Sequence, residues 1–266
     1  MMNPTTEPTP LLSRLLWPLP LACFLAEHWE RLPLVIARQE PTYWQALLGL
    51  KAGDALQEIL ASPARQTEGI WVLESGLDGH STFFHQLHRR SPLIAACCFE
   101  LAAEMSHPVE AELVVSPPDW QGLPYAEDCD LFILQIDGHK RWVVHPPTRA
   151  LPLVGAVAPV RRSALGGKPV LEADLNAGDL LYAPRGYVLV PATQSHPSLH
   201  IGLRVCVRRW AELFEAALAV AAGQDARYGH PLPGRGVWSV AEGSTVDLPP
   251  LSAHLSAALR RLSALL

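Results

Sequence analysis

The chain has 266 residues, of which 49% are hydrophobic and eight are Trp, enough for the core of one large domain with or without a small appendage. Its net charge of −5 and pI of about 6.1 argue against a general nucleic-acid or anionic-membrane binder, because such proteins need a basic surface. The five cysteines form neither a CxxC motif nor an even disulfide framework, which indicates a reducing compartment and a cytoplasmic protein. No uninterrupted apolar stretch approaches the roughly 18–20 residues that span a bilayer.

The sequence predicts three parts. Residues 1–14 are expected to form a flexible leader, residues 15–207 the main domain, and residues 208–266 a C-terminal helical region. The apolar residues 11–26 are not expected to be a signal peptide, because no Lys or Arg precedes them and Pro18 and Pro20 interrupt them.

The elements of the first half follow from hydrophobic spacing. A short helix is predicted at residues 21–29, followed by a strand that begins near Pro33, and further helices are predicted within residues 43–60 and 83–106. Branched residues predict strands at 109–115 and 131–136. Gly138 then predicts a tight hairpin, with residues 140–145 returning as the partner strand.

The second half alternates turns and short strands. Residues 148–169 are predicted to form a loop, and a Gly178-Asp179 turn, a short apolar strand and a Pro184-Arg-Gly186 turn follow it. Ser198 begins the next strand, and two amphipathic helices are predicted at 210–222 and 251–265. Their apolar stripes predict self-association through Leu213, Phe214, Ala217, Leu218 and Val220 on the first helix and Leu251, Leu255, Ala258, Leu259, Leu262 and Leu266 on the second.

Two motifs carry a family resemblance. One is Asp130-Leu-Phe-Ile-Leu-Gln135 followed by Gly138-x-Lys140-x-Trp142, and the other is Trp29-Glu30-x-x-Pro33 ahead of an apolar strand. With the Gly-Asp and Pro-x-Gly turns, they resemble the JmjC-type, cupin-like 2-oxoglutarate oxygenases, especially the ribosomal-protein hydroxylases. The resemblance implies a mainly β fold with flanking helices, namely a double-stranded β-helix of the jelly-roll type followed by C-terminal helices.

The same resemblance implies an iron site that this chain has altered. In that family a His-x-Asp pair and a His from a later strand hold Fe(II), leaving positions open for 2-oxoglutarate and oxygen. The motif register places Tyr125 at the first His, Glu127 at the Asp and Leu189 at the second His. Leu189 has no donor atom, and Tyr125 could bind only as a phenolate, which is costly for a group with a pKa near ~10. We therefore expect no Fe(II) in a facial triad and no cofactor.

Lys140 is the candidate ligand-binding residue. The resemblance places it where the family has a Lys or Arg that binds the distal carboxylate of 2-oxoglutarate, so we expect it to point into the barrel. Glu112 stands where relatives carry Asn and would repel 2-oxoglutarate, so the pocket is expected to have changed chemically. His200 is expected to be a core histidine whose hydrogen bonds are satisfied, and His85-x-x-His88 to lie on one face of an amphipathic helix.

Three hypotheses about function stay open. The first is a pseudo-oxygenase that binds a peptide, a protein or a small carboxylate. The second is an active enzyme acting on a peptide, a protein or a natural product: either a divergent hydroxylase that uses Fe(II) and 2-oxoglutarate, or a metal-independent catalyst that uses Tyr125, Glu127 and Lys140. The third is a subunit that dimerises through its C-terminal helices and supports an active relative. None of them involves nucleic acid or a membrane.

Overall fold

The computed structural model describes residues 9–48, 71–76, 79–147, 149–153, 155, 160–165 and 167–224. The chain divides into two units, Met1–Val207 and Arg208–Leu266, and every strand within the described residues lies in the first. Among the described residues, no helix has the length and apolar character required to cross a membrane.

The central strand β6 (Asp130–His145) belongs to two sheets. Its first half pairs with β8 (Leu180–Ala183) and β10 (Ser198–Val205), and its second half pairs with β7 (Leu171–Asn176) and β9 (Val188–Ala192). All four pairings are antiparallel. This sharing of one strand is what joins the two sheets into a barrel.

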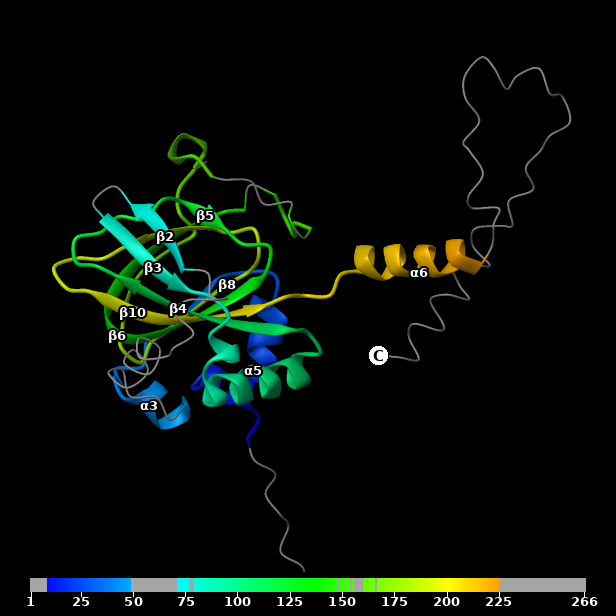
Figure 1. Cartoon of the computed structure of the whole chain (residues 1–266). Coiled ribbons are helices and arrows are strands. Elements are labelled where there is room, and N and C mark those ends of the chain that lie inside the picture. The colour runs from blue at the N-terminus through cyan, green and yellow to red at the C-terminus, as the bar shows by residue number, and fades with distance from the viewer. Residues whose placement is uncertain are drawn as a thin grey trace, which may run out of the picture. The chain divides into compact units, whose positions relative to one another are not determined.

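The remaining strands extend the two sheets. The first sheet has the order β1-β8-β6-β10-β4-β3-β2, and β5 pairs with β9 at the edge of the second. Figure 1 shows the strands curling around a common interior. The predicted double-stranded β-helix is therefore confirmed. The added strands are β1 (Leu34–Ile36), β2 (Trp71–Gly76), β3 (Gly79–Phe84), β4 (Val109–Ser116) and β5 (Tyr125–Ala126).

Gly138 does not form the predicted tight hairpin. It lies within β6 opposite Ser198, at the point where the strand passes from one sheet to the other. Its φ of +65° favours glycine, and a Cβ here would come within 2.1 Å of the Pro197 carbonyl oxygen. The glycine therefore bends the strand without reversing it, and residues 140–145 pair with β7 and β9 instead of with residues 131–136.

The helices differ from the predicted ones in two places. Residues 11–14, expected in the flexible leader, form part of α1 (Leu11–Leu16), whose leucines are buried. The helix expected within 83–106 begins only at Pro92, because β3 continues to Phe84 and Ser91 caps the helix by accepting a hydrogen bond from the Ile94 amide. The second C-terminal helix and residues 49–60 lie outside the described residues. The other helices are α2 (Leu21–Cys23), η1 (Phe24–His28), α3 (Tyr43–Leu48), η3 (Leu87–Arg89), α5 (Pro92–Met105), η4 (Arg162–Ala164) and α6 (Trp210–Gln224).

Two hydrophobic clusters hold the first unit together. The larger one packs the N-terminal helices and α5 against the first sheet, and in it the rings of Phe24, Phe132 and Tyr182 contact one another. The smaller one has members from both sheets, including Trp142 and Leu189, and so fills part of the barrel interior. The candidate site residues lie around this smaller cluster.

Candidate functional site

Two of the three positions assigned to iron ligands meet across a strand pair. Tyr125 and Leu189 are direct partners in the β5–β9 pairing. Leu189 is buried in the interior cluster, and Tyr125 is partly buried against the same cluster. Tyr125 and Leu189 are 64 residues apart in the chain, and the pairing of β5 with β9 brings them together. Glu127 lies two residues after Tyr125.

The third position, Glu127, is held by an arginine. Its Oε2 accepts a hydrogen bond from Arg204 Nη2 on β10 at 2.8 Å, and both side chains are about three-quarters buried. Burial raises the pKa of the Glu127 carboxyl to about 7, although Arg204 opposes the shift. Arg204 is not predicted from the sequence, because a single arginine on a strand, 77 residues from its partner, carries no local signal.

These residues do not fit the iron of the family. A facial triad needs two imidazoles and a carboxylate, whereas the three positions offer a phenol, a carboxylate paired with a guanidinium, and an aliphatic chain. In the described part of the chain, no group of three or more His, Cys, Asp or Glu side chains is arranged to hold a metal ion.

Lys140 points into the barrel, as predicted. It is 1% exposed, and its Nζ donates a hydrogen bond to Ser116 Oγ at 2.7 Å. The ammonium also lies 4.9 and 5.2 Å from the ring centroids of Trp120 and Trp142, and Ser116 shares a 2.6 Å hydrogen bond with Ser81. A buried ammonium among hydroxyls and rings can stabilise an anionic ligand group.

His200 completes this polar cluster as a neutral histidine. It is buried and meets Trp142 edge-on, with ring centroids 5.5 Å apart. Burial lowers the pKa of His200 well below its usual value, and the charge of Lys140 adds to the shift. His200 is buried in the core as predicted, but it is not fully satisfied, because its Nδ1 has no hydrogen-bond partner in the described part of the chain. Within the described residues, the indole N–H groups of Trp120 and Trp142 have no hydrogen-bond partner, so both are donors that a ligand could use.

Glu112 is paired with His85. Its Oε2 lies 3.1 Å from His85 Nδ1, and the hydrogen bond that His85 donates to Glu112 raises the pKa of His85. The Glu112 side chain lies over Gly202, where a Cβ would come within 3.0 Å of it. The predicted helix face containing His85 and His88 is wrong, because His85 directly follows β3, and His88 accepts a hydrogen bond from the Ala111 amide.

Asp130 is a second buried carboxyl with a raised pKa. It lies at the start of β6, where its Oδ1 accepts hydrogen bonds from the Tyr182 hydroxyl at 2.9 Å and the Arg185 amide at 3.2 Å. Its Oδ2 has no hydrogen-bond partner in the described part of the chain. Burial raises the pKa of Asp130 to about 7, so the folded protein retains a proton that the unfolded chain releases near pH ~4.

Asp130→Asn should flatten the pH dependence of stability. Because the folded pKa is raised, the contribution of Asp130 is fully present below pH ~4 and is lost as the pH rises to about 7. Between pH ~4 and about 7, Asp130 should lower the wild-type free energy of unfolding by about 1.4 kcal/mol for each unit that the pH rises. The variant should lack this contribution to the slope. Urea unfolding at several pH values measures the slope. Asp137→Asn, at an exposed position of β6, is the control and should keep the wild-type slope.

The chain is similar in sequence to known oxygenases with a JmjC domain. Residues 89–213 match the JmjC domain family. The chain is 30% identical over 256 residues to ribosomal oxygenase 1 of Gallus gallus, covering 84% of this chain and 42% of that protein. It is 29% identical over 245 residues to the bifunctional lysine-specific demethylase and histidyl-hydroxylase NO66 of Aedes aegypti, covering 81% and 39%. The chain thus spans about two fifths of the length of these relatives.

The fold also matches a solved bacterial structure. Escherichia coli YcfD superposes with a TM-score of 0.61 at 18% identity, over 92% of this chain and 67% of that one. YcfD is a ribosomal oxygenase whose structure is also known with cobalt and 2-oxoglutarate. The fold thus defines a cupin-like double-stranded β-helix protein. Taken with the sequence relatives, the domain match shows that residues 89–213 form a JmjC domain, which confirms the resemblance of the motifs to the JmjC-type 2-oxoglutarate oxygenase family.

Proposed function

We propose that this chain is a JmjC-fold binding protein without an iron centre, which holds a carboxylate-bearing ligand in its barrel. The ligand is a small carboxylate or a carboxylate group of a peptide or protein. We further propose that the protein acts in the cytoplasm, either alone or as the accessory subunit of an active relative.

The pairing of Tyr125 with Leu189 carries the proposal. Two ligand positions of the family have become a phenol and an aliphatic side chain in direct register with each other, and Leu189 is packed in the interior cluster. The remaining carboxylate, Glu127, already has Arg204 as its partner. A chain altered at all three positions is better suited to binding than to oxygen chemistry.

The polar cluster around Lys140 supports a carboxylate as the ligand. Its ammonium is buried beside Ser116. The neighbouring rings of Trp120 and Trp142 carry two indole N–H groups that have no hydrogen-bond partner within the described residues. Donors of this kind bind carboxylate oxygens through charge-assisted hydrogen bonds, which are stronger in a buried site than in water.

Metal content tests the loss of iron. Protein purified without a His tag and reconstituted anaerobically with Fe(II) should retain far less than one iron per chain after desalting. The triple variant Tyr125→His, Glu127→Asp and Leu189→His should retain about one, because it restores two imidazoles and a carboxylate. Elemental analysis gives both numbers.

A double variant provides the matched control for this experiment. Tyr125→His with Glu127→Asp leaves Leu189 in place and should retain less iron than the triple variant. Stoichiometric iron in the unaltered protein would show that the proposal is wrong, whatever the variants do.

A second candidate function is an active enzyme, and the pKa of Glu127 favours it. A carboxyl with a pKa of about 7 is suited to general acid–base catalysis near neutral pH, with Tyr125 and Lys140 as further proton donors. A divergent Fe(II)-dependent hydroxylase is the other form of this alternative. Turnover of 2-oxoglutarate that chelators abolish would indicate the hydroxylase. Turnover that resists chelators but disappears in Glu127→Gln would indicate the metal-independent catalyst.

We also propose self-association through α6. Trp210, Phe214 and Leu218 follow one another at four-residue spacing and are 73%, 42% and 45% exposed, whereas Ala217 is buried. Of the predicted stripes, only this first one lies within the described residues.

Phe214→Glu with Leu218→Glu should convert a dimer into a monomer at micromolar concentration, because each change places a charge in the apolar contact. Light scattering measures the mass. Glu215→Gln, at an exposed position of the same helix, should leave the dimer intact. A wild-type monomer would contradict the proposal.

A further inference from the structure

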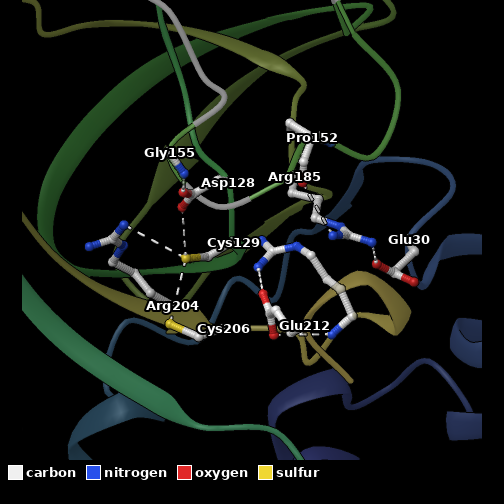
Figure 2. Close-up of polar contacts among 10 residues, drawn as sticks. Glu30, Asp128, Cys129, Pro152, Gly155, Arg185, Arg204, Cys206 and Glu212 are labelled. Carbon is white, nitrogen blue, oxygen red and sulfur yellow. Dashed lines mark hydrogen bonds and ion pairs between the residues drawn. The ribbon is translucent and has the colours of Figure 1, made fainter. Parts of the chain in front are cut away.

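Two free cysteines from different strands meet close to Glu127. Cys129 immediately precedes β6 and Cys206 immediately follows β10, and their sulfur atoms lie 3.6 Å apart although 77 positions separate them in the chain (Figure 2). Asp130 and Val205 are direct partners in the β6–β10 pairing, so the two cysteines continue the same antiparallel register. Cα atoms in such pairs lie about 4.5–5.5 Å apart, within the range of about 4.4–6.8 Å that disulfides span.

We propose that Cys129 and Cys206 form a reversible disulfide, which acts as a redox switch beside the candidate site. Cys206 is partly exposed and Cys129 is 5% exposed, so a reagent reaches Cys206 first. Its thiolate attacks a small-molecule disulfide and forms a mixed disulfide, releasing one small thiolate. The Cys129 thiolate then attacks the Cys206 sulfur and expels the second. The two cysteines are oxidised, and the small disulfide is reduced to two thiols that take up the two protons.

The sulfur of Cys129 has two further contacts that the disulfide would change. It donates a hydrogen bond to Asp128 Oδ1 at 3.3 Å, and the other oxygen of Asp128 accepts one from the Gly155 amide at 2.8 Å. Arg204 Nη2 lies 3.7 Å from the same sulfur and is also the atom that donates to Glu127. Figure 2 shows Cys129 between Asp128, Arg204 and Cys206.

Oxidation would therefore affect both the candidate site and the contact between Asp128 and Gly155. The S–H donor to Asp128 disappears, and Cys129 Sγ moves toward Cys206 until the sulfur atoms are about 2.05 Å apart. Arg204 then loses the contact with Cys129 that helps to place it against Glu127. Asp128 keeps its hydrogen bond from the Gly155 amide but loses the one from Cys129 that helps to orient it.

Thiol counting and peptide mapping test the disulfide. Reduced protein treated with glutathione disulfide should lose two of its five free thiols and the mass of two hydrogen atoms, and a peptide map should link Cys129 to Cys206. The oxidised protein should unfold at a higher urea concentration, because the cross-link restricts the unfolded chain. Dithiothreitol should reverse both changes. Cys23→Ser, which removes another partly exposed cysteine, should behave as the wild type.

Single replacements in the pair separate the steps. Cys129→Ser should stop at a glutathione adduct on Cys206, and Cys206→Ser should lose the urea shift altogether. A wild-type protein that retains five thiols, stops at the adduct or forms a different link would overturn the proposal. Amide hydrogen exchange at Gly155 should speed up on oxidation, and an unchanged rate would overturn the coupling between the disulfide and Gly155.

Discussion

Replacing Lys140 by Met should abolish the thermal shift that 2-oxoglutarate produces and weaken its binding by at least about 30-fold. The ammonium is buried and hydrogen-bonded to Ser116 beside two tryptophan rings, so the ligand carboxylate would lose a partner that water cannot replace. That factor corresponds to about 2 kcal/mol, the lower end of what removing one member of a buried charged pair costs. Differential scanning fluorimetry and calorimetric titration measure the two effects.

The control for this prediction is Lys168→Met, because Lys168 is exposed and should leave the response unchanged. The Lys140 variant should remain folded, because Met has a side chain of similar length and Ser116 keeps its hydrogen bond to Ser81. Succinate serves as a second probe. A Lys140 variant that binds both probes as well as the wild type would exclude Lys140 as the receptor, and a wild type that binds neither would exclude the carboxylate ligand itself.

Replacing Arg38 by Met should destabilise the protein by about 4 kcal/mol. Arg38 is buried between α1 and the barrel, and its guanidinium donates to the carbonyl oxygens of Leu15, Trp17 and Gly178. The same guanidinium lies 4.4 and 4.7 Å from the ring centroids of Tyr43 and Trp44. The variant would leave three carbonyl groups without this donor and remove both ring contacts, and each buried unsatisfied group costs about 1–3 kcal/mol.

Urea unfolding gives the free-energy difference for the Arg38 variant. Arg89→Met removes an exposed arginine from η3 and should change the free energy of unfolding by less than about 0.5 kcal/mol. A loss of less than about 1 kcal/mol for the Arg38 variant would show that α1 is held mainly by its buried leucines.

Local sequence patterns were sufficient to predict those strands and helices whose formation depends on residues close together in the chain. The branched runs before Gly138 and after Ser198 predicted strands, and the apolar spacing after Trp210 predicted α6, because side-chain direction repeats every two residues in a strand and every 3.6 in a helix. The inward direction of Lys140 was predicted from the family resemblance, and the same alternation explains why Lys140 and Trp142 are both buried. Local patterns were misleading at Gly138, since a glycine that relieves a clash with Pro197 has the same signature as a glycine in a hairpin turn.

The amino-acid sequence by itself predicted the JmjC resemblance and the barrel, and it places a phenol at position 125, a carboxyl at 127 and an aliphatic side chain at 189, because these depend on residue types at motif positions. Only the tertiary structure decided that Arg204 pairs with Glu127, that Glu112 pairs with His85 and that Cys129 meets Cys206. Each of these contacts joins residues that are distant in the chain and meet only through strand register. Strand register is set by the packing of the whole barrel, so no pattern within a short window of the sequence could predict them.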